Sequence, residues 1–135
     1  MRIVPKPDEL TAPYWEGARE GKLLLQQCRN CGNTWHPPTP ICNRCQSDDI
    51  AWRESSGRGA VYSHTIVQHA THVAMQGRTP YLVAQVELEE GTRVVANILD
   101  CPLEAVRIGM PVEVTFEEIA PGVVLPQFRP RRDAP

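Results

Sequence analysis

The sequence predicts a mainly β protein built from an N-terminal helix, a ribbon held by four cysteines and a five-stranded barrel. Three observations lead to this prediction. A short helix-forming segment lies near the start of the chain, four of the five cysteines form two C-x2-C pairs, and segments rich in β-branched residues follow from Gly59 onward. Such segments, separated by turn residues, are typical of small barrels and sandwiches. We therefore divide the 135 residues into an arm (1–21), a zinc-ribbon segment (22–55) and a barrel with a short tail (56–135).

The overall composition excludes several classes of protein. A formal net charge of -2 gives the whole chain no electrostatic attraction to nucleic acid or anionic lipid. No apolar run approaches the ~18 to 20 residues that cross a bilayer, and the first ten residues lack the apolar core of a signal peptide. We therefore expect a cytoplasmic protein without a membrane or nucleic-acid partner. The reducing cytosol disfavours disulfides and leaves thiolates available to bind a metal.

Residues 11–21, TAPYWEGAREG, predict a short helix that Thr11 could cap and Gly21 could end in a left-handed conformation. A helix of this length is only marginally stable by itself in water. Tyr14 and Trp15 lie on the same, apolar side of it. Two interpretations stay open: this side packs on the chain's own domain, or Tyr14 and Trp15 bind a partner protein.

The cysteines between residues 28 and 45 follow the pattern C-x2-C-x10-C-x2-C. Two intervening residues let both sulfurs of a pair face one point, and two such pairs facing each other form a tetrahedral metal site. Disulfides, a redox-active dithiol and four unrelated thiols are the alternatives, which the expected compartment and the duplicated spacing disfavour. The predicted metal ligands are Cys28, Cys31, Cys42 and Cys45.

Zinc is the metal that this site favours, although four sulfurs could also hold iron as in rubredoxin. Nothing else in the sequence indicates the partner surface of an electron-transfer protein. Four protein ligands leave no open position on the metal, so the predicted zinc is structural and not catalytic. We expect Arg29 and Arg44, which lie inside the two cysteine pairs, to offset part of the negative charge of the thiolates.

The barrel is predicted from alternating residues. In the clearest strand, Val112, Val114 and Phe116 alternate with polar residues, a pattern that buries one face and exposes the other. Gly91 is available for the turn of a tight hairpin between the second and third strands. A longer insertion between the third and fourth strands could form a turn of helix, and this arrangement favours the OB-fold. The expected strands are residues 60–68, 81–88, 92–99, 111–118 and 123–128.

No set of residues in the sequence indicates a catalytic site. The histidines are interpreted as solvated or packing residues and not as a second metal site. Cys101 is interpreted as a small buried residue, because a nucleophile needs a positioned base that the sequence does not reveal. The carboxylates at strand ends do not form an obvious acid and base pair. The residues considered are His64, His69, His72, Cys101, Glu87, Glu89 and Asp100.

Several segments together carry a family resemblance: YWEGAREGKLLLQQCRNCG, CNRC, SSGRGAVYSHTIV, PYLVAQVELEEGTRVVANI and IGMPVEVTFEE. From about Pro13 to Phe128 the chain resembles the acyl-CoA-associated proteins that join a rubredoxin-like zinc ribbon to an OB-fold. The resemblance implies a role in coenzyme A thioester metabolism, such as the degradation of steroid side chains or fatty acids. It also implies a separate thiolase-like enzyme or MaoC-like hydratase as partner.

Two functions from different classes follow. The first is a non-catalytic accessory subunit of an acyl-CoA-processing enzyme. The alternative is a single-stranded nucleic-acid binder, which the sparse aromatic residues and numerous glutamates of the strands disfavour. An enzyme in its own right is a third, less favoured interpretation. For contacts with coenzyme A phosphates the candidates are Arg58, Arg129, Arg131 and Arg132, although arginines near a terminus are commonly just solvated.

Overall fold

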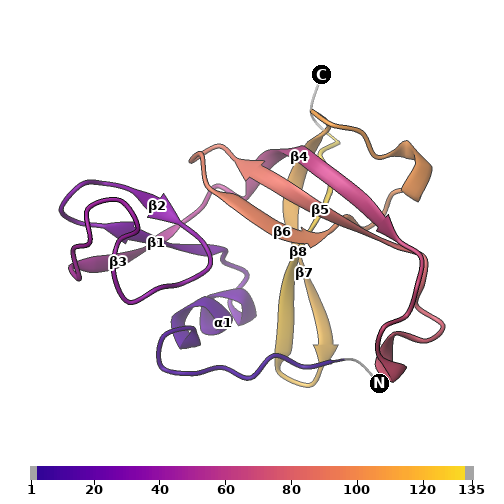
Figure 1. Ribbon diagram of the computed structural model, residues 1–135, viewed down its shortest axis with the longest axis horizontal. Coiled ribbons are helices and arrows are strands. Elements are labelled where there is room, and N and C mark those ends of the chain that lie inside the picture. Colours follow the sequence, from indigo (N-terminus) through magenta and orange to yellow (C-terminus); the bar gives the residue numbers. More distant parts are fainter. Residues whose placement is uncertain (1–2, 133–135) are drawn as a thin grey trace.

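A computed structural model describes residues 3–132 of the chain (Figure 1). The described part consists of a helix, a three-stranded sheet and a five-stranded sheet, so the predicted mainly β fold is confirmed. The helix and the first sheet comprise α1 (Ala12–Arg19), β1 (Leu24–Cys28), β2 (Thr34–Trp35) and β3 (Ile50–Glu54). The second sheet comprises β4 (Arg58–Val67), β5 (Tyr81–Leu88), β6 (Arg93–Asn97), β7 (Pro111–Ala120) and β8 (Val123–Pro130). Two 3-10 turns, η1 (Val73–Met75) and η2 (Leu103–Ala105), lie in the connecting loops.

The five-stranded sheet is antiparallel with the order β6-β5-β4-β7-β8. It curls until its two edge strands meet, where Ile98 pairs with Phe128 in a parallel bridge. The N–H of Leu99 donates to the carbonyl of Phe128 at 2.7 Å. This contact explains why β6 ends at Asn97, earlier than the predicted residue 99: the chain leaves β5 there to reach β8. The expected turn of helix between β6 and β7 is the short η2.

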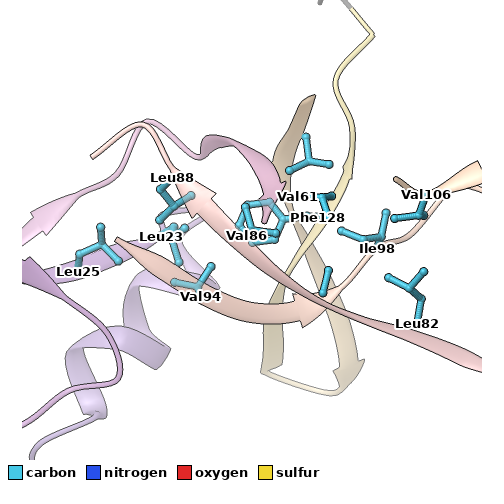
Figure 2. Packing of buried hydrophobic residues seen from close by; sticks show 12 residues of the cluster. Leu23, Leu25, Val61, Leu82, Val86, Leu88, Val94, Ile98, Val106 and Phe128 are labelled. Atoms are coloured by element: carbon cyan, nitrogen blue, oxygen red, sulfur yellow. The ribbon is translucent and has the colours of Figure 1, made fainter. Parts of the chain in front are cut away.

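The core of the barrel is made of the inward-facing residues of these strands. Val112 is fully buried, and Val114 and Phe116 pack against the same cluster, so the inward-facing residues predicted for this strand are confirmed. The exposed face predicted for it is not, since Glu113, Thr115 and Glu117 are half-buried like Val114 and Phe116. Leu25 of β1 and Leu23, which directly precedes this strand, also belong to this cluster, as Figure 2 shows. The ribbon and the barrel therefore share one hydrophobic core, although their sheets are separate.

The ribbon is the three-stranded antiparallel sheet with the order β2-β1-β3. Its own buried cluster is small and consists of Cys28, Trp35 and Cys42, with Ile50 packed against it. Strand β2 was not expected from the sequence, because two residues are too few to show an alternating pattern. So small a cluster leaves the shape of the ribbon dependent on its metal.

Polar contacts join the ribbon to the turn between β5 and β6. The carboxylate of Glu90 accepts a hydrogen bond from the Ser55 hydroxyl and another from the N–H of Ser56, both at 2.8 Å. The hydroxyl oxygens of Thr34 and Thr92 lie 2.8 Å apart. The division into an arm, a ribbon and a barrel stays a prediction, and these contacts cross the predicted boundary near residue 55.

The helix α1 lies between the ribbon and the β7–β8 hairpin and contacts β1 and β8 (Figure 1). The prediction that Thr11 caps this helix is wrong, since its side chain makes no capping bond. The Thr11 hydroxyl instead donates to Asp8 Oδ1 at 3.0 Å and accepts from the Asp8 N–H, because a preceding tight turn offers nearer partners. Gly21 has φ +77°, in agreement with its predicted left-handed conformation.

Candidate metal centre and adjoining surfaces

The fold brings the two cysteine pairs together. The sulfurs of the four cysteines all lie within 4.8 Å of one another, and all four thiols are free. Cys28 and Cys42 are buried, whereas the second member of each pair lies at the surface. The closest sulfur pairs are Cys28 with Cys45 at 3.5 Å and Cys31 with Cys42 at 3.7 Å.

Each pair belongs to a tight turn, and the two turns repeat the same hydrogen-bond pattern. In the first turn the N–H of Gly32 donates to the carbonyl of Cys28 at 2.9 Å, and in the second the N–H of Gln46 donates to the carbonyl of Cys42 at 3.0 Å. Gly32 and Gln46 both have positive φ, +79° and +66°. This left-handed residue closes the turn and directs both sulfurs of the pair to one point.

The sulfurs accept hydrogen bonds that stabilise thiolates. The N–H groups of Arg44 and Cys45 lie 3.3 and 3.5 Å from Cys42 Sγ. Burial would raise the pKa of Cys42, but these N–H groups and the Asn33 amide prevail and lower it to about 6. The amide of Asn30 is the main cause that lowers the pKa of Cys45. Thiolates at neutral pH are what zinc requires of its ligands.

Cys31 differs from the other cysteines in its protonation. The N–H of Asn33 lowers its pKa, but desolvation and the three neighbouring sulfurs outweigh this effect and raise the pKa to about 11. Sulfurs this close cannot all carry a negative charge without a cation between them. The arrangement therefore fits a divalent metal with thiolate ligands, and zinc is the ion that four sulfurs in tetrahedral order commonly hold.

The sequence prediction for Arg29 needs correction. Arg29 forms a 3.1 Å ion pair with Asp49 at the surface, so its charge is directed to a carboxylate and not to the sulfurs. Arg44 contributes its backbone N–H to Cys42, and a role for its charge stays a prediction. The described hydrogen bonds to the sulfurs come from neutral N–H groups.

The other residues considered as functional from the sequence do not converge. Among residues 3–132, the histidine, cysteine and carboxylate side chains form one group that could hold a metal ion, the four ribbon cysteines. His64 and His69 are exposed, and the Nδ1 atom of His72 accepts a hydrogen bond from the N–H of Ala74 at 2.9 Å. Cys101 packs against the barrel core but is only half-buried, less than the small buried residue expected from the sequence.

Three of the four arginines proposed to bind phosphates lie together at one end of the barrel. Arg58 and Arg129 flank Glu113 across three adjacent strands. Arg129 pairs with Glu113 and Arg58 with Glu89, both at 3.0 Å, and Arg131 lies 4.0 Å from Glu89. Hydrogen bonding from Arg58 holds the pKa of Glu89 below its usual value. These carboxylates already occupy the guanidinium groups in part.

The fourth arginine, Arg132, follows the last strand and is exposed. The role of the four arginines in binding coenzyme A thus stays a prediction.

The predicted partner-binding aromatics face different surroundings. Tyr14 packs against the barrel core and stacks on His36, with ring centroids 4.9 Å apart and planes 32° from parallel. Burial raises the pKa of Tyr14 to about 12 and lowers the pKa of His36. Trp15 is half-buried and contacts the Tyr14 ring edge to face. Tyr14 is thus largely enclosed by its own chain, and Trp15 keeps part of its surface exposed.

Trp15 lines a concave surface that we call the arm groove. This cavity of about 450 Å³ is bounded by α1, by the Pro-rich turn of the ribbon and by β6 and β8. None of its lining side chains is an aspartate, glutamate, lysine or arginine. Val95, 66% exposed, lies on its β6 side. The groove is therefore an uncharged, largely apolar surface.

Within residues 3–132, no helix combines the length and the hydrophobicity that a bilayer crossing requires.

Comparison with known proteins identifies the two parts of the chain. Residues 15–51 match the family model described as "ChsH2, rubredoxin-like zinc ribbon domain". Residues 52–117 match the model described as "ChsH2, C-terminal OB-fold domain". The predicted zinc ribbon, the OB-fold and zinc as the cofactor are confirmed by these matches together with the clustered cysteines.

Relatives are found in bacteria and archaea. The chain is 35% identical over 114 residues to a DUF35 domain-containing scaffold protein of Methanocaldococcus jannaschii, covering 83% of this chain and 80% of that protein. It is 33% identical over 118 residues to the benzoylsuccinyl-CoA thiolase subunit BbsA of Geobacter metallireducens. This match covers 87% of this chain and 71% of that protein. The chain is also 39% identical over 130 residues to a probable enoyl-CoA hydratase alpha subunit of Thermomonospora curvata. This match covers 96% of this chain but only 40% of that longer protein.

A solved structure shows the same fold. A chain of the structure described as "Ltp2-ChsH2(DUF35) aldolase" superposes with a TM-score of 0.83 at 40% sequence identity, covering 93% of this chain and 98% of that chain. The resemblance predicted from the sequence is thereby confirmed. This chain belongs to the ChsH2 (DUF35) family, whose members join a rubredoxin-like zinc ribbon to a C-terminal OB-fold domain.

Proposed function

We propose that this chain is a non-catalytic accessory subunit that supports the assembly of an acyl-CoA-processing enzyme. The observation that carries the proposal is the similarity, along nearly the full length of both chains, to a chain of the Ltp2-ChsH2(DUF35) aldolase. Relatives named as a scaffold protein and as a thiolase subunit support the same role. A thiolase- or aldolase-like enzyme is the first expected partner, and a MaoC-like hydratase is the second.

The chemistry of the described residues supports a non-catalytic role. Four cysteine ligands fill the coordination sphere of a tetrahedral zinc ion, so the metal has no free position for water or substrate. The histidines, Cys101 and the carboxylates considered from the sequence are spread over separate parts of the barrel. The free thiols of the ribbon fit a reducing compartment, and we include a cytoplasmic location in the proposal.

The arm groove supports a protein partner. Its uncharged lining and its exposed Val95 suit an apolar protein surface, and interface centres are depleted of charged residues in the same way. Trp15 lies on the rim between α1 and the barrel, and tryptophan is a residue type that commonly dominates binding energy. We therefore propose that the arm and the barrel together form the partner-binding surface.

Contact with coenzyme A is a second part of the proposal. Arg58, Arg129 and Arg131 lie close together, and a phosphate could replace Glu89 and Glu113 as their anionic partner. Replacing these three residues and Arg132 by alanine in the assembled complex should weaken its affinity for coenzyme A. Unchanged affinity would mean that these arginines only stabilise and solvate this end of the barrel.

The nucleic-acid alternative gains no support from the structure, because the clustered arginines pair with carboxylates instead of forming an open basic groove. The direct test of the accessory role is co-expression with a thiolase-like enzyme, followed by size-exclusion chromatography. We expect the two chains to elute together and the zinc-loaded chain alone to turn over no acyl-CoA. Separate elution of two folded chains at micromolar concentration would reject the assembly role, and turnover by the isolated chain would reject the non-catalytic one.

A further inference from the structure

Two asparagine side chains direct their amide groups at sulfurs of the metal centre. Asn30 Nδ2 lies 3.5 Å from Cys45 Sγ, and Asn33 Nδ2 lies 3.7 Å from Cys42 Sγ. The Asn33 amide is also held by Asn43, whose Oδ1 atom accepts a hydrogen bond from it at 2.6 Å. Neither asparagine was considered as a functional residue in the sequence, since the cysteine spacing says nothing about the residues between the ligands.

Both contacts cross from one turn to the other. Asn30 and Asn33 lie in the first cysteine turn, whereas the sulfurs that they meet belong to the second turn. The Asn33–Asn43 hydrogen bond makes a third link in the same direction. The amides therefore connect two turns that otherwise meet mainly through the sulfurs and the bound metal.

The negative charge of the metal centre gives a physical reason for these amide contacts. A divalent ion with four thiolate ligands carries an excess of negative charge, and the nearby Arg29 is paired with Asp49. Amide N–H groups can stabilise that charge without binding the metal themselves. Cys45 lies at the surface, so the amide over its sulfur also stands where a proton, a chelator or an electrophile would approach.

We propose that Asn30 and Asn33 are the side chains that retain zinc in the ribbon. Their amides orient the sulfurs of Cys45 and Cys42 and keep the second turn in place. A thiolate that has left the metal for a moment is then held in position to bind again. The two residues thereby slow the release of zinc and the modification of the outer thiolate.

The test uses the zinc-loaded full chain with Asn30→Asp and Asn33→Asp, which preserve shape but remove the N–H donors. Gln46→Glu is the matched control, because it adds the same charge to the second turn at a side chain with no sulfur contact among those described. Zinc transfer to a chromogenic chelator is followed over time. We expect release about 10-fold faster in each Asp variant and close to wild type in the control, as for other residues that support metal ligands.

A second measurement separates the loss of the donor from the added charge. Asn30→Ala and Asn33→Ala, loaded with cobalt, should shift the sulfur-to-metal charge-transfer band, and Asn30→Ala should speed alkylation of Cys45 by iodoacetamide. If an Asp variant loses its zinc during purification while Gln46→Glu stays fully loaded, the proposal is also supported, because the variant then fails to retain zinc at all. Release from both Asp variants at the rate of Gln46→Glu, with an unshifted cobalt band in the Ala variants, overturns it.

Discussion

Thr34 of the ribbon and Thr92 of the barrel are 58 residues apart in the sequence, yet their hydroxyl oxygens lie 2.8 Å apart. The same barrel turn holds the chain after β3 through Glu90. Together with the ribbon leucines in the barrel core, these contacts fix the orientation of the ribbon on the barrel. An accessory subunit with one rigid shape can present the arm, the ribbon and the barrel to a partner as a single surface.

Zinc content tests the assignment of the ligands. Metal analysis of the purified chain should find about one zinc per chain, and Cys42→Ser should abolish it because a fully buried ligand is lost. Cys101→Ser is the matched control, since this thiol lies outside the cluster, and it should retain the metal. Stoichiometric iron, or full zinc content in Cys42→Ser, would contradict the assignment.

Leu25 tests whether the ribbon and the barrel share a core. This ribbon residue has no exposed surface and packs in the barrel cluster, so Leu25→Ala should lower the free energy of unfolding by about 2 to 5 kcal/mol. Urea unfolding should show one transition for the zinc-loaded chain. Ile108→Ala, at a side chain 70% exposed, is the control and should change little. Two separate transitions, with the barrel unaffected by Leu25→Ala, would show that the cores are independent.

Glu90 tests the polar contact between the two parts. Glu90→Gln keeps the size of the side chain but replaces one carboxylate oxygen by an NH2 group, which is a donor. The single oxygen that remains cannot take the place of both oxygens that accept from the Ser55 hydroxyl and the Ser56 N–H. The expected loss is about 1 to 3 kcal/mol of unfolding free energy, the usual cost of losing a charged hydrogen-bond partner. Glu118→Gln, at an exposed position of β7, serves as the control. Equal stabilities of the two variants would remove Glu90 from this role.

The parts of this protein that the sequence predicts are those determined by local spacing. The cysteine repeat identifies Cys28, Cys31, Cys42 and Cys45 because a C-x2-C turn needs only its own residues to direct two sulfurs. Val112, Val114 and Phe116 recur at every second residue and predict β7 for the same reason, and these three side chains do meet the barrel core.

Features that depend on distant partners are not visible in the sequence. The participation of Leu25 in the barrel core depends on how the two sheets pack, and the amide of Asn30 is aimed at a sulfur of the other turn. None of these relationships has a fixed spacing along the chain, which is why pattern and propensity do not reveal them.

His36 makes the stability of the folded protein dependent on pH. Burial lowers the pKa of His36 from its ordinary value of 6.5, so the unfolded chain takes up a proton at a higher pH than the folded chain does. The contribution of the buried, neutral His36 to the free energy of unfolding is full above pH 6.5, and it is lost as the pH falls through the lowered pKa. His36→Phe, which preserves the ring stack on Tyr14, should reduce the loss of unfolding free energy between pH 7.5 and about pH 5.5.

Urea unfolding of the zinc-loaded proteins at the two pH values measures this effect. His69→Phe, at an exposed histidine, is the control and should keep the pH dependence of the wild type. Because all three proteins contain the same ribbon cysteines, acid effects on the metal centre cancel in the comparison. An identical pH dependence in His36→Phe and the wild type would show that burial of His36 has no energetic consequence.

Trp15 tests the proposed partner surface. It is half-buried at the edge of the arm groove, where its neighbour Tyr14 is already enclosed by the chain's own core. A large aromatic side chain at such a position is typically one of the few residues that carry most of the binding energy. Trp15→Ala should therefore weaken the complex with the thiolase-like partner by about 2 kcal/mol or more. Isothermal titration calorimetry with the purified partner measures the change, and Ile108→Ala, exposed but outside the groove, is the control for a general loss of apolar surface. If Trp15→Ala binds as tightly as the wild type while the complex itself forms, the partner contacts another face, and the groove has no part in assembly.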